Sequence, residues 1–337
     1  MIVKLFPDFI RFSAMPCPIK PTPINPTLVI HPHPFQFSTY YRSSDQTTGG
    51  ENYMDIGIVM PCSAITPPDL IAETARAIEE RGFASIWAPE HVIFFEEYQS
   101  QYPYADHGKL HGFDHGMMEP WTTLSFIASN TSHVKLGSSI CLVPQRNPVY
   151  TAKQVADVDF LSNGRVIFGV GAGWLKEEFD ALQVPFERRG ARTRDYIKVM
   201  QALWTMEQPS YTGEFYKLPN CTQSPKPVQN PHPPIFFGGE SRPALRRVAE
   251  LGQGWMGASL MPEDLPEKIA LLDELLAEAG RNRGDIDIYT LPNQAPKAEL
   301  FPRYEDLGVK QVIHLVPMKN IDDVRQRLDT LVKISMR

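Results

Sequence analysis

One stretch in the middle of the chain predicts a β-α-β unit with parallel strands. Val134 to Val143 is rich in β-branched and small residues, and Pro148 to Leu161 has the apolar spacing of a helix. Arg165 to Val170 is almost wholly apolar after its first residue, as expected of a strand buried on both faces. Two strands joined by one helix must run parallel. Parallel sheets bind ligands at the carboxyl ends of their strands, so we expect a site beside Ser138 to Pro144 and Gly171 to Trp174.

The same alternation of strand and helix repeats along the chain. Eight strands are expected, at Asp55 to Met60, Ala84 to Ala88, Val134 to Val143, Val166 to Val170, Pro234 to Phe237, Gly254 to Ala258, Ile286 to Leu291 and Gln311 to Val316. Helical patterns alternate with them, at Pro67 to Arg81, Pro120 to Ser129, Pro148 to Leu161, Ala191 to Trp204, Ser241 to Leu251, Glu263 to Ala279, Lys297 to Asp306 and Ile321 to Val332. Eight such units over about 280 residues match a (β/α)8 TIM barrel, with an open doubly wound sheet as the alternative.

The central helix of this pattern has one apolar face. Ala152, Val155, Ala156 and Phe160 are expected to share that face and to pack against the sheet. The sequence Ser-Asn-Gly directly after Leu161 then ends the helix.

Composition excludes several classes of partner. The 337 residues are 42% hydrophobic and carry a net charge of -6 at pH 7, with Lys and Arg scattered rather than clustered. No apolar run approaches the roughly 20 residues that span a bilayer. We therefore expect neither nucleic acid nor a membrane as a partner. The four cysteines form no CxxC pair, which indicates a reducing, cytoplasmic setting without zinc or disulfides; they are Cys17, Cys62, Cys141 and Cys221.

Residues 1–53 depart from the pattern. They are rich in proline, contain no glycine before Gly49 and show neither strand nor helix periodicity. They also lack the uninterrupted apolar core of a secretory signal. We expect a disordered extension or a start codon placed too far upstream, with Met54 as the alternative start, and residues 54–337 as the barrel domain.

An ordered set of motifs connects the chain to a known family. The motifs include Leu142 to Pro148, Leu161 to Arg165, Gly169 to Trp174, Arg188, Arg192, Pro233 to Ile235, Gly238 to Ser241 and Gly254-Trp255. Over about residues 54 to 335 this set resembles the bacterial luciferase-like superfamily of flavin and deazaflavin enzymes. It is most similar to the compact branch that depends on coenzyme F420. The resemblance implies a flavin-type cofactor at the carboxyl mouth of the barrel.

Glycines at two strand ends are expected to hold the phosphate of that cofactor. Gly238 and Gly239 end the fifth strand, and Ser241 follows as a good N-cap for the next helix. Backbone amides at a helix start attract anions, and absent side chains let a phosphate approach. The resemblance places the phosphate between this turn and the turn that contains Gly171 and Gly173. A simple strand-to-helix turn is the alternative.

Other cofactor contacts are expected around the same mouth. The resemblance implies a cis peptide bond between Ser139 and Ile140, in a bulge behind the central ring of the cofactor. Met60, at the end of the first strand, is expected to contact the cofactor. Trp174 is expected to form a wall of the pocket or to cap the barrel rim. Glu177 and Glu178, next along the chain, are interpreted as ordinary acidic residues of a first helical turn.

His91 is the expected catalytic residue. It ends the second strand, and a histidine near a barrel mouth suits proton transfer because its ordinary pKa lies near neutrality. In the resembled family, a histidine at this strand end faces the reactive edge of the flavin. Glu90 is expected either to orient His91 or to pair with a cation of the barrel.

The loop from Val92 to Met118 is long and aromatic, which is typical of a lid or a substrate wall. His107, His111 and His115 recur every four residues, but the glycines between them disfavour a helix, so no metal site is expected. The cluster of arginines near position 190 has two interpretations, an anion site or surface ion pairs; its members are Arg188, Arg189, Arg192 and Arg194.

The sequence therefore predicts a luciferase-like oxidoreductase. We expect F420-dependent hydride transfer to or from a small organic substrate, with His91 moving the matching proton. The alternatives are a monooxygenase that uses reduced FMN and a non-catalytic flavin-binding protein on the same fold. A homodimer is expected.

Overall fold

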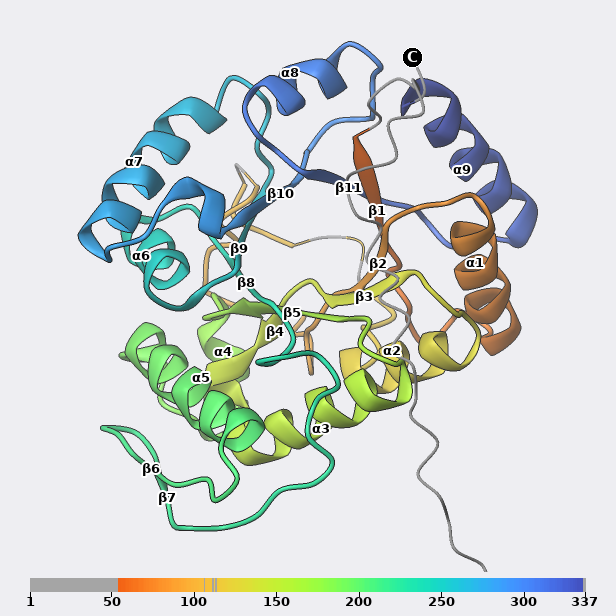
Figure 1. The fold of residues 1–337 in the computed structure, drawn as a ribbon. Coiled ribbons are helices and arrows are strands. Elements are labelled where there is room, and N and C mark those ends of the chain that lie inside the picture. Colours follow the sequence, from red (N-terminus) through yellow and green to blue (C-terminus); the bar gives the residue numbers. More distant parts are fainter. Residues whose placement is uncertain (1–53, 106, 111, 113, 336–337) are drawn as a thin grey trace, which may run out of the picture. The chain divides into compact units, whose positions relative to one another are not determined.

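Eight parallel strands close into a barrel in the computed structural model, which describes residues 54–105, 107–110, 112 and 114–335. The strands are β1 (Asp55–Val59), β2 (Ser85–Ala88), β3 (Lys135–Ser138), β5 (Val166–Gly171), β8 (Ile235–Gly238), β9 (Gly254–Ala258), β10 (Asp287–Leu291) and β11 (Gln311–Leu315). Their order is β3-β2-β1-β11-β10-β9-β8-β5, and pairing of β3 with β5 closes the ring (Figure 1). The short β4 (Cys141–Leu142) continues β3 after a break and also pairs with β5. The TIM barrel expected from the sequence is confirmed.

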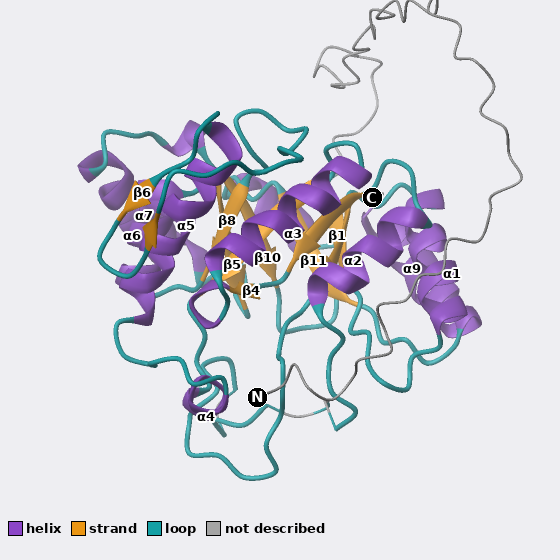
Figure 2. Ribbon diagram, turned by 90° about the horizontal axis from the view of Figure 1, so that it is seen from below, coloured by secondary structure: helices purple, strands orange, loops and turns teal. Residues whose placement is uncertain are grey.

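Helices surround the barrel and follow the expected order (Figures 1 and 2). They are α1 (Pro68–Glu80), α2 (Pro120–Ser129), α3 (Pro148–Leu161), α5 (Arg189–Thr205), α6 (Arg242–Leu251), α7 (Leu265–Glu278), α8 (Leu300–Asp306) and α9 (Ile321–Ser335). Smaller additions are α4 (Lys176–Ala181), the 3-10 turns η1 (Val143–Gln145) and η2 (Arg283–Asp285), and a hairpin of β6 (Tyr211–Thr212) and β7 (Lys217–Leu218). Within the described ranges, no helix combines the length and apolar character needed to cross a membrane.

Aromatic and aliphatic side chains fill the barrel interior. Trp87 contacts Tyr289 edge-on, with ring centroids 6.0 Å apart, and Phe236 stacks near the same tyrosine at 4.5 Å. A Cβ atom on Gly137 would lie 2.1 Å from Trp87 Cε3, so this glycine makes room for the indole. The Trp87 Nε1 group donates to Ser85 Oγ at 2.6 Å, which satisfies its one polar atom. Because the middle of the barrel is packed, a ligand has room only at its carboxyl end.

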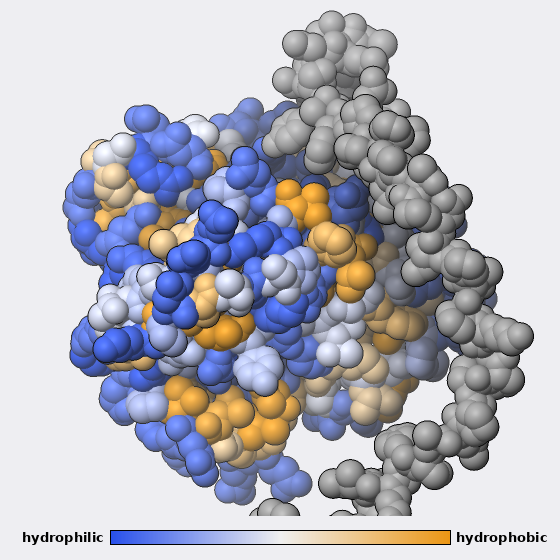
Figure 3. Space-filling model, turned by 60° about the horizontal axis from the view of Figure 1, so that its bottom comes forward, coloured by the Kyte–Doolittle hydropathy of each residue, from blue (hydrophilic) through white to orange (hydrophobic). Residues whose placement is uncertain are grey.

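The apolar face of α3 differs from the expected one by one residue. Ala152, Val155 and Ala156 are fully buried, but Phe160 is 57% exposed. Asp159 occupies the buried position instead, because it lies seven residues, or two turns, after Ala152. Its carboxylate accepts hydrogen bonds from backbone and side-chain N–H groups at positions 228 and 229 and so anchors the loop before β8. Other exposed apolar side chains form separate patches on the surface (Figure 3).

The burial of His314 predicts that acid destabilises the barrel. Its ring lies between β11 and Phe301 of α8, is 7% exposed, and has no hydrogen-bond partner for Nε2 among the described residues. Burial lowers the pKa of His314 to about 4 from its ordinary 6.5. Between these values the unfolded chain binds a proton that the folded chain does not, so the free energy of unfolding decreases as pH falls.

Because of His314, the unfolding free energy of the wild type should fall by about 2 kcal/mol between about pH 8 and about pH 5. We expect this decrease to be absent from a His314→Leu variant. Urea unfolding at both pH values measures this difference. His115→Gln, at an exposed histidine, is the matched control and should behave like the wild type. An unchanged pH difference in His314→Leu would show that another group causes the acid sensitivity.

Candidate active site at the carboxyl end of the barrel

A cavity of about 680 Å³ opens where the barrel strands end. Its lining contains all but one of the residues expected to bind cofactor or to act in catalysis. These are Glu90, His91, Ser139, Ile140, Gly171, Gly173, Trp174, Gly238, Gly239 and Ser241. The exception is Met60, which is fully buried in the outer core. Val59 lines the cavity instead, because successive residues at a strand end point to opposite faces.

Ile140 forms the floor of the cavity between two strand ends. The peptide bond from Ser139 to Ile140 is cis, as the family resemblance implied. A Cβ atom on Gly171 would lie 2.2 Å from Ile140 Cδ1, and one on Gly238 would lie 2.8 Å from it. These two glycines therefore make room for the isoleucine side chain. Gly173 has a φ of +79° and lies against Phe179. A glycine is needed here because the turn uses a left-handed backbone conformation and leaves no room for a side chain.

His91 is held by a buried carboxylate that the sequence did not reveal as a site residue. His91 Nδ1 lies 3.2 Å from Glu178 Oε2, and the Glu178 side chain is fully buried. Glu178 also accepts hydrogen bonds from the Val92 amide at 2.7 Å and from Gln145 Nε2 at 2.9 Å. An ionised carboxylate only accepts, so Nδ1 carries the proton of the neutral ring and Nε2 is left for the cavity. Glu178 is thus more than the ordinary first-turn residue expected.

The electrostatic balance around Glu178 favours its ionised form. Burial raises the pKa of this carboxyl, but hydrogen bonds from His91, Gln145 and the Val92 amide outweigh burial and hold the pKa below its usual range. An ionised, immobile carboxylate fixes both the tautomer and the orientation of a histidine that it contacts.

Glu90 has a different partner from His91. Its carboxylate accepts hydrogen bonds from the Leu142 amide at 2.6 Å and from Arg146 Nε at 2.7 Å, and it forms an ion pair with the same guanidinium. Arg146 also reaches Glu119 at 2.7 Å. Of the two expected roles for Glu90, the structure supports pairing with a cation. Its assignment as a catalytic residue stays a prediction, and through the Leu142 amide it anchors β4 at the edge of the cavity.

Aromatic rings from the long loop after β2 cover one side of the cavity. The Trp174 ring contacts Tyr98, Tyr102 and His91 edge-on, with centroids 5.1 to 5.7 Å apart. Glu177 holds the same loop by accepting hydrogen bonds from the amides of residues 99 and 100. Trp174 and its neighbours therefore form a wall of the cavity beside His91, as expected for a substrate loop.

Two arginines bring positive charge to the lining of the cavity. Arg189 donates from Nε to the Gly173 carbonyl group beside Trp174, and Arg247 is 8% exposed, whereas Glu240 adds a carboxyl group next to the Gly238-Gly239 turn. Ser241 is at the N-cap position of α6, but its side chain makes no capping hydrogen bond. Pro243 has no N–H group and the Ala244 amide donates to the Ser241 carbonyl oxygen, so the Arg242 amide of this first turn keeps its capacity to bind an anion. Arg247 was missed from the sequence, although it lies three residues after the buried Ala244 and so on the inner face of the helix.

Of the other arginines near position 190, Arg188 and Arg194 form ion pairs with Glu214 and Glu250. Arg192 donates to the backbone carbonyl groups of Pro185 and Glu187. Among described residues, no three His, Cys, Asp or Glu side chains gather as metal ligands, and His111 lies outside the described residues.

Comparisons with known proteins agree with this fold. The sequence profile of the family described as luciferase-like monooxygenase matches residues 37–293. An uncharacterized protein of Mycobacterium tuberculosis is 33% identical over 283 residues, which cover 82% of this chain and 97% of the relative. The FMNH2-dependent dimethylsulfone monooxygenase of Pseudomonas putida is 32% identical over 139 residues, or 40% of this chain and 38% of that protein.

A solved structure shows the same fold. Coenzyme F420-dependent tetrahydromethanopterin reductase from Methanopyrus kandleri superimposes with a TM-score of 0.64 and 18% identity, covering 82% of this chain and 97% of that chain. The chain folds into a TIM barrel with a cavity at its carboxyl mouth. The chain belongs to the luciferase-like monooxygenase family, whose members are oxidoreductases.

The contact between Glu178 and His91 predicts a single tautomer. In ¹⁵N-labelled protein at about pH 8, above the ordinary imidazole range, the His91 ring should carry its proton on Nδ1. Glu178→Gln should give a mixture of tautomers, because a carboxamide can both donate and accept. Two-bond ¹⁵N–¹H correlations measure this, and His91→Gln identifies the signal. Glu177→Gln, at the adjacent carboxylate, is the matched control and should change nothing. A wild-type His91 protonated on Nε2 would contradict the assignment.

Proposed function

We propose that this protein is an F420-dependent oxidoreductase in which His91 moves the proton that accompanies hydride transfer to or from a small organic substrate. The observation that carries the proposal is the arrangement of the cavity. His91 lies beside an aromatic wall with its Nδ1 atom held by Glu178, and two arginines and the start of α6 belong to the lining of the same cavity. Such a cavity offers both proton transfer and anion binding.

The residues present fit a phosphate-bearing flavin or deazaflavin. A cavity of about 680 Å³ has the size of a cofactor site, and Arg247 is a buried cation at its edge. Gly239, Ser241 and Arg247 would hold the phosphate, Ile140 would lie behind the ring system, and Trp174 would close the site. When bound, F420 supplies the hydride donor or acceptor.

The residues of the chain supply the remaining functions. Glu178 holds the His91 ring so that Nε2 can give a proton to the substrate or take one from it. The loop after β2, held by Glu177 and Glu178, places Tyr98 and Tyr102 around Trp174 and keeps water from that side of the cavity. The apolar and aromatic surroundings of His91 favour an uncharged organic substrate.

Two neighbours support different cofactors. The Methanopyrus reductase uses F420, whereas the Pseudomonas relative depends on FMNH2. The sequence resemblance to the compact F420-dependent branch favours F420 for this chain. The second candidate, a monooxygenase that uses reduced FMN, rests on the 32% identity to the dimethylsulfone enzyme over 139 residues. A homodimer and a cytoplasmic location stay predictions.

Titration with cofactor tests the proposal directly. Trp174 lines the cavity, so binding of F420 should quench tryptophan fluorescence, and FMN should bind more weakly in the same assay. Trp174→Phe should lose most of the quenching while calorimetry still detects binding, because the phosphate contacts come from other strands. Preferential binding of reduced FMN would favour the monooxygenase, and binding of neither would contradict both candidate functions.

A further inference from the structure

A second, outer pocket of about 360 Å³ lies between α5 and α6. Four arginines, Pro243 and the first-turn residues Gly190 and Ala191 of α5 line this pocket, and its lining contains no acidic residue. Arg247 lines both spaces. We propose that the outer pocket binds carboxylate groups that the cofactor carries beyond its phosphate. This inference rests on the proposed function.

Arg247 is a buried cation without a counter-ion. It is 8% exposed, and no ion pair or hydrogen bond joins its guanidinium to another residue in the described part of the chain. Burial lowers the pKa of Arg247 to about 10, and the nearby charges of Arg194 and Arg189 act in the same direction, opposed by Glu250 alone. Buried charges in proteins are normally paired, because an unpaired one costs free energy. An anion in the two spaces that Arg247 lines is therefore the missing partner, and Arg247 can contact both the phosphate in the cavity and a group in the outer pocket.

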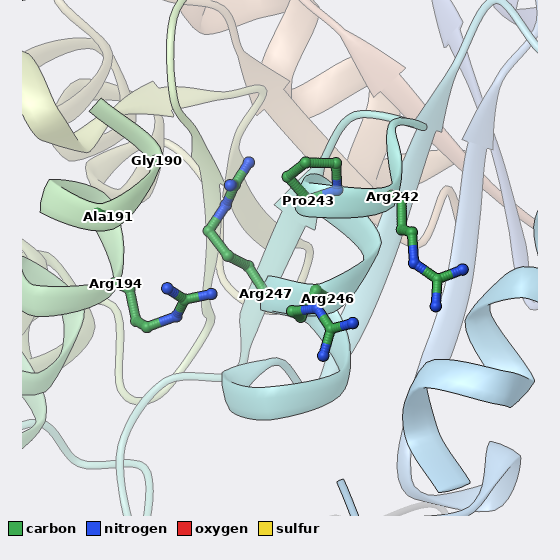
Figure 4. A pocket seen from close by; sticks show the side chains of 7 residues that line it. All are labelled: Gly190, Ala191, Arg194, Arg242, Pro243, Arg246 and Arg247. Carbon is green, nitrogen blue, oxygen red and sulfur yellow. The ribbon is translucent and has the colours of Figure 1, made fainter. Parts of the chain in front are cut away.

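The start of α5 gives the outer pocket a second attraction for anions. α5 is 17 residues long, and the N-cap side chain of Arg188 makes no capping hydrogen bond. Gly190 allows Arg247 to approach this helix start, since a Cβ atom there would lie 2.8 Å from an Arg247 guanidinium nitrogen. Figure 4 shows Arg247 extending from α6 towards α5, beside Gly190. A helix N-terminus and a buried guanidinium thus face the same space.

Two surface arginines extend this positive region outwards. Arg194 of α5 and Arg246 of α6 line the outer pocket and are about one-third and two-fifths exposed. Their acidic partners, Glu250 and Glu278, do not contribute to the lining. The guanidinium groups therefore present their remaining N–H donors to a ligand in the pocket, and Arg is suited to binding carboxylates in this way.

To occupy both the start of α6 in the cavity and the outer pocket, a ligand needs more than one anionic group. One phosphate at the start of α6 leaves the start of α5 without an anion and the remaining N–H donors of the outer arginines without an acceptor in the pocket. FMN ends at its phosphate, whereas F420 carries further carboxylates on a chain of glutamate residues attached through its phosphate. The outer pocket thus selects for the longer, more negative cofactor by charge.

Binding of F420 with different tails tests this inference. Calorimetry should show that F420 with five or so glutamate residues binds the wild-type protein at least about tenfold more tightly than F420 with one, an effect of about 1.4 kcal/mol. The double variant Arg194→Gln and Arg246→Gln should bind both forms alike. Arg188→Gln, at an exposed arginine that lines neither pocket, is the matched control and should keep the tail effect.

The possible outcomes separate the inference from the proposed function. Equal affinity of the wild type for both forms of F420 would contradict the inference that the outer pocket binds the tail carboxylates, but it would not contradict the F420-dependent function. A tail effect that survives in the double variant would place the carboxylates elsewhere and also overturn the inference. Binding of FMN without binding of either F420 would overturn the proposed function and the inference together. Melting temperatures of the variants establish that they are folded.

Discussion

The hydrogen-bonded carboxylate of Glu178 is the constraint on which the site depends. It lies on α4, yet its partners come from the end of β2 and from η1, so a single buried charge connects three segments of the barrel mouth. Burial alone would favour protonation of this group, but the hydrogen bonds from its donors outweigh burial and hold its pKa below the usual range. The same set fixes His91 and the start of the long loop.

The rest of the cavity is organised around this fixed point. The Ile140 side chain packs against Gly171 and Gly238, where a larger residue would clash with it, and it forms the floor of the cavity. Trp174 stands beside His91, and Arg247 carries positive charge at the α5–α6 side. In the proposed function, the aromatic residues beside His91 contact an apolar substrate and Arg247 contacts the anionic part of the cofactor. This division of charge links the fold to the proposed chemistry.

Local sequence patterns predicted the barrel and the strand-end residues well. Apolar runs gave the strands, and His91, the Gly238-Gly239 turn and Trp174 were identified because they directly follow such runs. Local patterns could not predict contacts between distant segments. Glu178 contacts His91, which lies 87 positions earlier in the sequence, and Arg247 of α6 lies against Gly190 of α5. Met60 was misassigned because strand alternation turns it away from the cavity. In α3, counting two helical turns from Ala152 leads to Asp159, which is buried, rather than to Phe160, which is exposed.

The central claim is that His91 moves a proton while other residues bind the cofactor. The most direct measurement is the single-turnover rate of cofactor-saturated His91→Gln, followed by the visible absorbance of F420 with a substrate found by screening small alcohols and ketones. The account predicts unchanged cofactor affinity and melting temperature, and a rate lower by about two to four orders of magnitude. A folded, cofactor-saturated variant that turns over at the wild-type rate would contradict it.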